Sequence, residues 1–415
     1  MSLWGPGSTT VRQTRRHTHL VTIVPVPLRR RVVARDSREQ ERVSTPLELL
    51  FDLVFVVAIA SNAAELHHGL AAAHYGTIVG YTATWFAIWW AWLNYTWYAS
   101  AYDNNDVVFR LLTFVIMIGA LFLAAGVPDI FADGQSTTVV IGYAIMRFAM
   151  VGLWLRAAAG HPERRETALW YATGITIAQV LWIARLWVPE AWLFPTFFLL
   201  VGLELLVPVF AEQRHGRTPF HPHHIAERYG LLTIIVLGEV ILSSVQAIQG
   251  VMAGEGAGVT WDLAPLIAGG LLIVFSLWWM YFSRDHASIV ESPRGAWVFG
   301  YGHLPVFASI AAVGAALAAG VDVVEGSADA GPRPIALALA VAVSLVALTI
   351  SGLHAMSDRD TVATMVPAAV VTVLCLTVAL LVPSMGLAIL LIGLVLGTMV
   401  ALRVVSAARS TEGRG

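Results

Sequence analysis

Long apolar runs separated by short polar connections dominate this sequence, and they restrict the fold more than any other feature. A helix needs about 20 apolar residues to cross the hydrocarbon core of a bilayer. Twelve runs of about that length occur, at residues 46–66, 76–99, 107–127, 137–157, 168–188, 191–211, 225–248, 263–283, 296–321, 334–355, 362–382 and 384–405. Only 13% of the residues are charged, about half the share in a soluble domain. The sequence therefore predicts an all-α polytopic membrane protein with about twelve transmembrane helices.

The arginine residues indicate how these helices are oriented. All 25 basic residues are Arg, and short cytoplasmic loops of membrane proteins carry an excess of positive charge. If both termini are cytoplasmic, every Arg except Arg147, Arg185 and Arg333 lies in a tail or near an inward connection. This pattern predicts an even number of spans with both ends of the chain in the cytoplasm.

The segment before the first apolar run, residues 1–43, is polar and basic without helical periodicity. We expect a disordered cytoplasmic tail that contacts anionic membrane lipids, and a second short tail at 407–415. Charge alone does not indicate nucleic-acid binding. Residues 20–28 are too short and too interrupted by Pro for the apolar core of a signal peptide, so no cleavage is expected.

Absent residue types exclude several chemistries. Without Lys the chain can form no Schiff base and no phosphate-binding loop of the Gly-Lys-Ser/Thr type. Its one cysteine, Cys375, can form no internal disulfide. We predict no cofactor.

The two halves of the chain share local sequence patterns. Trp278-Trp279 and the Tyr, Ser and Asp that follow resemble the end of the second run, around Trp89 to Asp103, and the end of the ninth run resembles that of the third. These matches indicate two parallel six-helix repeats, residues 44–212 and 213–406. Chance similarity between Ala-rich apolar segments is the alternative.

Two motifs point to a known family. Residues 47–55 read Leu-Glu-Leu-Leu-Phe-Asp-Leu-Val-Phe, and residues 227–239 read Glu-Arg-Tyr-Gly-Leu-Leu-Thr-Ile-Ile-Val-Leu-Gly-Glu. In this order they resemble the low temperature requirement A (LtrA) family of bacterial membrane proteins. The resemblance implies a protein of the bacterial cytoplasmic membrane, connected with growth in the cold. It implies no biochemical activity and no catalytic residue, and the basic extension before Arg42 is not part of the pattern.

The first motif carries two acids in an apolar run. Thr45, Pro46 and Glu48 fit a helix start in which Glu48 forms a capping box with Thr45, which gives Glu48 a structural role. Asp52 lies one turn further in and shares the face of Glu48. Ionisable groups inside a membrane are costly and usually functional, so Asp52 is a candidate for a substrate or ion pathway.

The second motif carries three charges. Glu227 and Arg228 are expected to anchor the inner end of the helix. Glu239 lies about 18 Å deeper, near the membrane midplane, and its expected partner is Arg147 of the fourth run. Glu204 of the sixth run is another acid that Arg147 could neutralise. These charges form either a structural clamp or part of a transport pathway.

His303 lies between two glycines and a proline, at 300–305, where the ninth helix should break or kink. Broken helices can line a binding cavity; a histidine with both nitrogens hydrogen-bonded is the alternative. The repeat offset makes His303 equivalent to a position near Arg110, and we include both as pathway candidates.

Other conspicuous residues favour structural roles. The Trp groups at 85–97 and 278–279 are typical of helix packing or an interfacial belt, with an aromatic substrate cage as the alternative. The His residues between 215 and 224 fit a basic loop, and the single Glu65-x-x-His68 unit is too little for a di-iron site. We therefore predict no metal site.

Three functions remain. Secondary transport of a small solute or ion, with Asp52, Glu239 and Arg147 around a central cavity, fits the predicted twelve spans and repeat best. A non-catalytic sensor or scaffold for growth in the cold is the first alternative. An intramembrane lipid-modifying enzyme is the second, and it would need a clustered nucleophile or base, which the sequence does not offer. Expected partners are membrane lipids and the solute.

Overall fold

The computed structural model describes residues 26–36, 39, 42–253, 263–357 and 361–412, and it contains no strand in these ranges. Twelve long helices occur there: α1 (Pro46–Ala71), α2 (Thr77–Tyr102), α3 (Val107–Asp133), α4 (Thr137–Gly160), α5 (Arg165–Ala184), α6 (Leu193–His215), α7 (Pro222–Ala253), α8 (Leu263–Phe282), α10 (Pro293–Glu325), α11 (Pro332–Ala355), α12 (Thr361–Leu381) and α13 (Met385–Glu412). Short turns of helix are α9 (Ala287–Glu291), η1 (Pro162–Arg164), η2 (Arg185–Trp187) and η3 (Glu190–Trp192). Each long helix overlaps one predicted run.

Eleven helices in the described ranges are long and apolar enough to cross a membrane, and α2 is not among them. The prediction of an all-α polytopic membrane protein is thereby confirmed. α2 is 26 residues long, the same length as α1, but its Trp, Tyr, Asn and Thr residues lower its mean hydropathy. Most of its residues are buried. Because α2 faces other helices rather than lipid, it can carry polar groups.

Burial also separates the two Trp groups. Trp85, Trp90 and Trp92 are at most 2% exposed, so the interfacial-belt interpretation is wrong for them. Trp85 donates to Leu304 of α10, Trp92 to Asp52 of α1 and Trp90 to Glu204 of α6. These side chains therefore face other helices on different sides of α2. Trp278 and Trp279 on α8 are 46% and 49% exposed, as expected for side chains that meet lipid.

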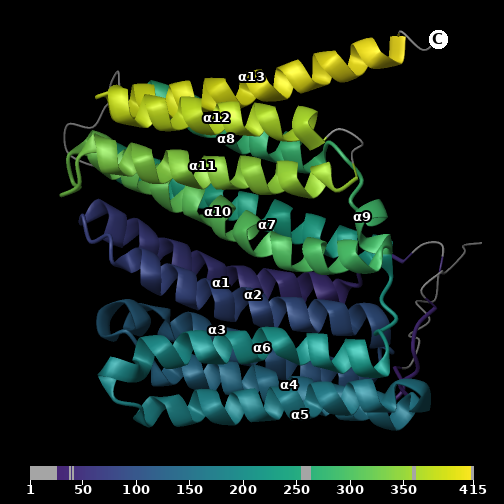
Figure 1. The fold of residues 1–415 in the computed structure, drawn as a ribbon. Coiled ribbons are helices and arrows are strands. Elements are labelled where there is room, and N and C mark those ends of the chain that lie inside the picture. Colours follow the sequence, from purple (N-terminus) through teal and green to yellow (C-terminus); the bar gives the residue numbers. More distant parts are fainter. Residues whose placement is uncertain (1–25, 37–38, 40–41, 254–262, 358–360, 413–415) are drawn as a thin grey trace, which may run out of the picture.

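The two halves of the chain lie one above the other in Figure 1, with α1 and α2 next to α7 and α10. In the first half α1 packs on α3, α3 on α4, α4 on α5 and α5 on α6; in the second half α7 packs on α10, α10 on α11, α11 on α12 and α12 on α13. The same order of neighbours supports the predicted duplication of 44–212 and 213–406, which stays a prediction. α8 packs much more closely on α13 than α2 does on α6.

Glycines permit the closest helix contacts. A Cβ atom on Gly119 of α3 would lie 2.6 Å from the carbonyl oxygen of Gly142 on α4, and one on Gly269 of α8 would lie 2.6 Å from the backbone of Ile389 on α13. Small residues at such crossings let transmembrane backbones approach each other. Gly119 and Gly269 thus contribute to helix packing.

The sequence predicts a break or a kink at 300–305. α10 runs without interruption from Pro293 to Glu325, so a break is wrong, and a kink stays a prediction. Its glycines permit close contacts instead: a Cβ on Gly300 would lie 3.3 Å from the Trp97 ring, and one on Gly302 would lie 3.1 Å from Leu353. Pro305 lies inside the helix. The helix thus continues through Pro305 despite the missing backbone donor.

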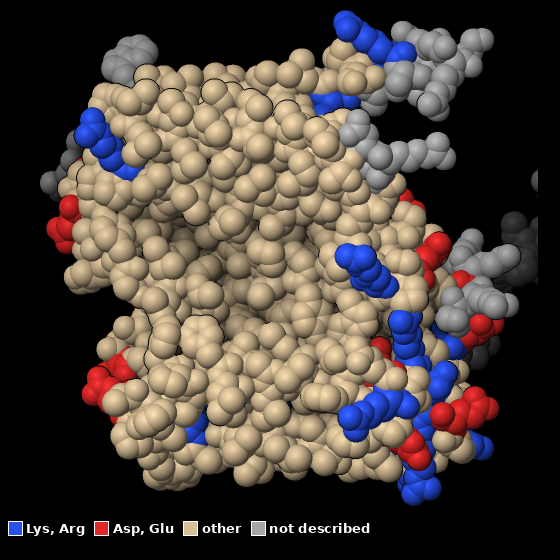
Figure 2. Space-filling model, in the orientation of Figure 1, with Lys and Arg blue, Asp and Glu red and all other residues tan. Residues whose placement is uncertain are grey.

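Most charged side chains gather at one end of the bundle, on the right of Figure 2, and the surface between the two ends is almost free of them. We call this the basic end; α1 begins there at Pro46 and α2 ends there at Tyr102. Between the two halves the uncharged surface is hollowed (Figure 2). The distribution agrees with a membrane-spanning orientation in which the helices cross the bilayer side by side.

The described part of the N-terminal segment packs against the basic end. Val32 is 2% exposed, Arg31 Nε donates to the carbonyl of Gly160 at 2.8 Å, and the backbone N–H of Arg30 donates to Asp106 at 2.7 Å. The rest of the predicted tail, residues 1–25, 37–38 and 40–41, lies outside the described residues. At the other end α13 continues to Glu412, so most of the predicted tail at 407–415 is helical, and 413–415 are not described.

Candidate functional site

The first motif forms the predicted helix start. Glu48 Oε2 accepts the backbone N–H of Thr45 at 2.9 Å, and Thr45 Oγ1 accepts the backbone N–H of Glu48 at 3.3 Å. With Pro46 in the first turn, this is the predicted capping box, which is confirmed. Glu48 has a second role as well, because its side chain is fully buried and reaches α7.

Four side chains from α1 and α7 form a buried group that we call the ion cluster: Glu48, Asp52, His224 and Arg228. Arg228 holds Asp52 through two contacts, Nη2 to Oδ1 at 2.5 Å and Nε to Oδ2 at 3.2 Å. Its third nitrogen, Nη1, lies 3.0 Å from Glu48 Oε1. His224 Nε2 lies 3.2 Å from the same oxygen. All four side chains have 0% exposure.

The prediction that Arg228 is an interfacial anchor is therefore wrong. α7 begins at Pro222 and its first turns pack against α1, so Arg228 faces protein rather than the lipid surface. Its neighbour Glu227 lies on another face and is half-buried. Both carboxylate oxygens of Glu227 accept the backbone N–H of Ser44 at 3.2 Å, which ties the segment before α1 to α7.

α2 supplies further hydrogen-bond donors. Trp92 Nε1 donates to Asp52 Oδ1 at 2.7 Å, so this carboxylate is held by an arginine and an indole. Trp97 Nε1 donates to the hydroxyl of Tyr229 at 3.0 Å, and Tyr229 packs edge-on against Trp92 at 4.8 Å. His224 was assigned to a basic loop, and the Trp group at 85–97 was assigned to packing or an interfacial belt, with an aromatic cage as the alternative. Neither was predicted to bind a carboxylate; the signal in the sequence was the unusual density of Trp in an otherwise apolar run.

The second buried charge pair joins α4 and α6. Arg147 Nη2 lies 2.5 Å from Glu204 Oε2, and both side chains are at most 1% exposed. Glu204 also accepts Trp90 Nε1 at 2.9 Å and the Tyr143 hydroxyl at 3.2 Å. Arg147 Nε and Nη1 are buried without a hydrogen-bond partner in the described structure. The acid that neutralises Arg147 is thus Glu204, and the expected pairing with Glu239 is wrong.

Glu239 lies on a different surface of the bundle. α7 packs mainly on α10 and α1, and α4 is not among its close neighbours, so Glu239 does not lie beside Arg147. Its side chain is half-buried and makes no hydrogen bond or ion pair with any residue of the described ranges. Sequence spacing predicts only the depth of a residue along its helix. Two side chains at the same depth contact each other only if they also lie on facing sides of their helices.

His303 and Arg110 occupy separate places. His303 is fully buried; its Nδ1 lies 2.7 Å from the Phe299 carbonyl and its Nε2 lies 2.9 Å from the Tyr281 hydroxyl. A carbonyl only accepts, so Nδ1 carries the proton, and both nitrogens are satisfied. Arg110 is half-buried near the start of α3 and donates to Asn105 at 2.9 Å. The structure therefore does not bring these two residues into one site.

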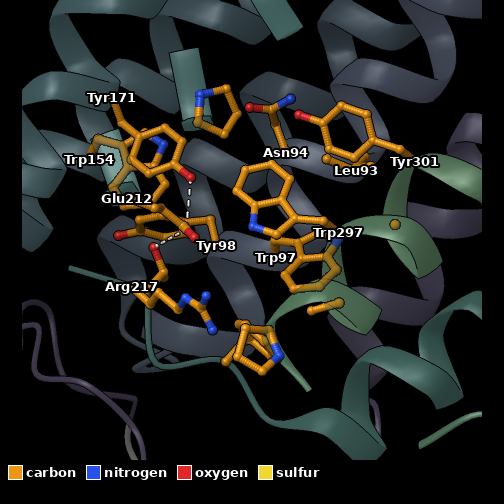
Figure 3. A pocket seen from close by; sticks show the side chains of 16 residues that line it. Leu93, Asn94, Trp97, Tyr98, Trp154, Tyr171, Glu212, Arg217, Trp297 and Tyr301 are labelled. Atoms are coloured by element: carbon orange, nitrogen blue, oxygen red, sulfur yellow. Dashed lines mark hydrogen bonds between the residues drawn. The ribbon is translucent and has the colours of Figure 1, made fainter. Parts of the chain in front are cut away.

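A pocket opens between the halves at the basic end, and Figure 3 shows its lining side chains. It lies between α2, α4, α5, α6 and α10. We call it the aromatic pocket, because its wall includes Trp97, Tyr98, Trp154, Tyr171, Trp297 and Tyr301. Two charged side chains, Glu212 and Arg217, also line it.

Comparison with known proteins identifies the family. The family model described as "Bacterial low temperature requirement A protein (LtrA)" matches residues 43–403. The chain belongs to the LtrA family. The match begins at Val43, so it leaves out the basic N-terminal segment and includes every residue of the ion cluster, the charge pair and the aromatic pocket.

One relative is a protein of Rhizobium meliloti (strain 1021) described as "Uncharacterized protein RA0937". The two sequences are 27% identical over 292 residues, which cover 66% of this chain and 69% of the relative. No solved structure is significantly similar to the chain. In the ranges that the structure describes, no group of three or more His, Cys, Asp or Glu side chains is placed to hold a metal ion.

Proposed function

We propose that this LtrA-family protein is a proton-coupled secondary transporter of a small solute, with both termini in the cytoplasm of the bacterial cell. The observation that carries the proposal is the ion cluster, where α1 of the first half meets α7 of the second. Transporters built from repeats place substrate and coupling-ion sites at the interface between the repeats. Buried ionisable groups in membrane proteins are rare and usually mark such pathways.

The charge balance of the ion cluster supports proton binding. Arg228 contributes one fixed positive charge, whereas Glu48 and Asp52 together can contribute two negative charges. With His224 neutral, a buried cluster is electrically neutral only when one of the two acids carries a proton. With His224 protonated, both acids can be ionised. Taking up or releasing one proton therefore changes which partner Arg228 holds, and this can bias how the halves pack.

Groups around the cluster extend it toward the basic end. Asp103, just after the end of α2, is 6% exposed, and burial together with the negative charge of Glu48 raises its pKa to about 6. A carboxyl group with such a pKa exchanges protons near neutral pH. Arg42 is also buried, 6% exposed, and donates to the carbonyl groups of Ala99 and Ser100. Asp103 is thus suited to pass protons between water and the cluster.

The test is proton movement in proteoliposomes that contain a pH-sensitive dye and receive a panel of small cations, anions and zwitterions. At least one solute class should move protons through the wild-type protein. In Asp52→Asn the rate should fall at least about tenfold, since an amide cannot bind the proton. The variant should still fold, because Glu48 remains beside Arg228 as its counter-charge.

Two further variants sharpen this test. Asp129→Asn alters an exposed acid that accepts a hydrogen bond from Ser136, so its rate should equal that of the wild type. Glu239→Gln removes an unpaired acid that lies about 18 Å along α7 from Glu227. A fall in the rate of proton movement in this variant, with a normal rate in Asp52→Asn, would make Glu239 the proton carrier in place of Asp52. Normal rates in both Asp52→Asn and Glu239→Gln would refute the assignment of proton coupling to these acids.

The alternatives predict a different outcome. A sensor or scaffold would show no solute-dependent proton movement with any member of the panel. An intramembrane enzyme would alter added lipids without any solute-dependent proton movement. The buried charges favour transport over both.

A further inference from the structure

We infer that the aromatic pocket binds a small zwitterion, with its ammonium group among the aromatic rings and beside Glu212, and its acidic group at Arg217. The biological role of this binding rests on the proposed transport function. The binding itself is argued from the pocket alone. The ligand would be a solute such as an N-methylated amino acid. Three features of the pocket carry the inference, and each is tied to a different part of that ligand.

The first feature is the aromatic wall. Figure 3 shows Glu212 and Tyr171 on one side of the pocket and Trp97, Trp297 and Tyr301 on the other. The Trp297 and Tyr301 rings lie 5.4 Å apart. Faces of Trp and Tyr attract cations within about 6 Å, and groups of them form the usual binding site for quaternary ammonium ligands. An apolar solute would need no acid in such a pocket.

The second feature is the carboxylate of Glu212. Its Oε1 accepts the hydroxyl groups of both Tyr171 and Thr218 at 2.9 Å, which fixes the side chain against the wall. A carboxylate oriented in this way on the pocket wall can attract the positive group of a ligand.

The third feature is the position of Arg217. This exposed side chain lines the pocket and makes no hydrogen bond or ion pair with any described residue. With Glu212 it gives the pocket one charge of each sign. A simple cation would be attracted by the acid and repelled by Arg217, whereas a zwitterion satisfies both charges. Guanidinium groups bind carboxylates through two parallel hydrogen bonds.

The size of the pocket limits the ligand. Its volume is about 60 Å³, whereas one water molecule needs roughly 10–15 Å³. The enclosed part therefore has room for a head group of a few non-hydrogen atoms. The acidic end of the ligand would extend toward the mouth and Arg217.

The pocket is connected to the ion cluster through aromatic contacts. Trp97 lines the pocket and donates to the Tyr229 hydroxyl, Tyr229 packs against Trp92, and Trp92 donates to Asp52. Movement of Trp97 on ligand binding would thus reach the carboxylate that Arg228 holds. This gives a route by which ligand and proton could influence each other.

The experiment is equilibrium binding of radiolabelled glycine betaine to the full-length protein in nanodiscs of phosphatidylglycerol, which contain no zwitterionic lipid. Saturable binding is expected. Glu212→Gln should weaken it about tenfold or more, because an amide does not replace a charge. Trp297→Leu should weaken it by a similar factor and Trp297→Phe by less, because Phe retains an aromatic face. Trp278→Leu, at a 46% exposed position on α8, is the matched control and should bind normally.

Further measurements distinguish the ligand classes. Arg217→Gln should weaken betaine binding and leave choline, which lacks the carboxylate, unaffected or improved. The zwitterion assignment would be overturned if choline and betaine bound equally well and Arg217→Gln weakened neither. It would also be overturned if the wild-type protein did not bind betaine. Loss of betaine binding in nanodiscs containing phosphatidylethanolamine would assign the pocket to a lipid head group instead. Binding in nanodiscs is measured without a proton gradient, so it is independent of transport. Betaine binding together with no betaine-dependent proton movement in proteoliposomes would refute the proposed transport function and support this inference.

Discussion

Arg228→Gln is expected to destabilise the protein more than any other single substitution at the basic end. The change leaves Glu48 and Asp52 fully buried without their shared cation. Breaking a buried ion pair by removing one partner costs about 3–5 kcal/mol, a large part of the roughly 5–15 kcal/mol that stabilises a typical folded protein. Thermal unfolding in detergent, followed by loss of the monodisperse peak on size exclusion, measures the effect.

The matched control is Arg110→Gln, which removes a half-buried guanidinium with one hydrogen bond to Asn105. Surface substitutions of this kind usually change stability by less than about 0.5 kcal/mol. Adding Glu48→Gln and Asp52→Asn to Arg228→Gln removes the uncompensated charges and should recover much of the lost stability. If Arg228→Gln unfolds at the same temperature as Arg110→Gln, the ion cluster does not hold α1 against α7.

The helices could be predicted from sequence because the signals are local. Length and hydropathy locate every long helix, with ends up to seven residues away from those of the predicted runs. The capping box at Thr45 and Glu48 depends on residues three positions apart. α2 was also predicted, although its aromatic and polar residues make it less apolar than the others. The error at 300–305 arose because a local rule, that Gly and Pro interrupt helices, was overridden by packing against Trp97 and Leu353.

The candidate site could be predicted only in part, because it depends on which helix faces meet. Asp52 and Arg228 are 176 positions apart, and nothing in either motif says that they touch. Spacing placed Glu204 and Glu239 at similar depths, but only Glu204 faces Arg147. The indole donors of α2 were missed for the same reason, because a Trp that packs and a Trp that binds a carboxylate have the same pattern in sequence.

Glu204→Gln is expected to be the most damaging substitution inside the first half, and more damaging than Arg147→Met. An arginine cannot lose its charge in a protein, whereas a glutamate can take up a proton. Glu204→Gln therefore leaves a buried cation whose Nε and Nη1 already lack partners in the described structure, at a cost of about 3–5 kcal/mol. In Arg147→Met the acid can become neutral and keep Trp90 and Tyr143 as partners. Unfolding temperatures of the two purified variants give the order.

The double variant Arg147→Met/Glu204→Gln decides what the pair is for. Replacing a buried ion pair by neutral groups of similar volume is often neutral or stabilising, so the double variant should be more stable than Glu204→Gln alone. A structural clamp predicts that it also keeps the wild-type rate of proton movement in proteoliposomes. A role in transport predicts a stable protein whose rate falls, because neither remaining side chain can change charge. A double variant no more stable than Glu204→Gln would show that the destabilisation does not come from the uncompensated charge of Arg147.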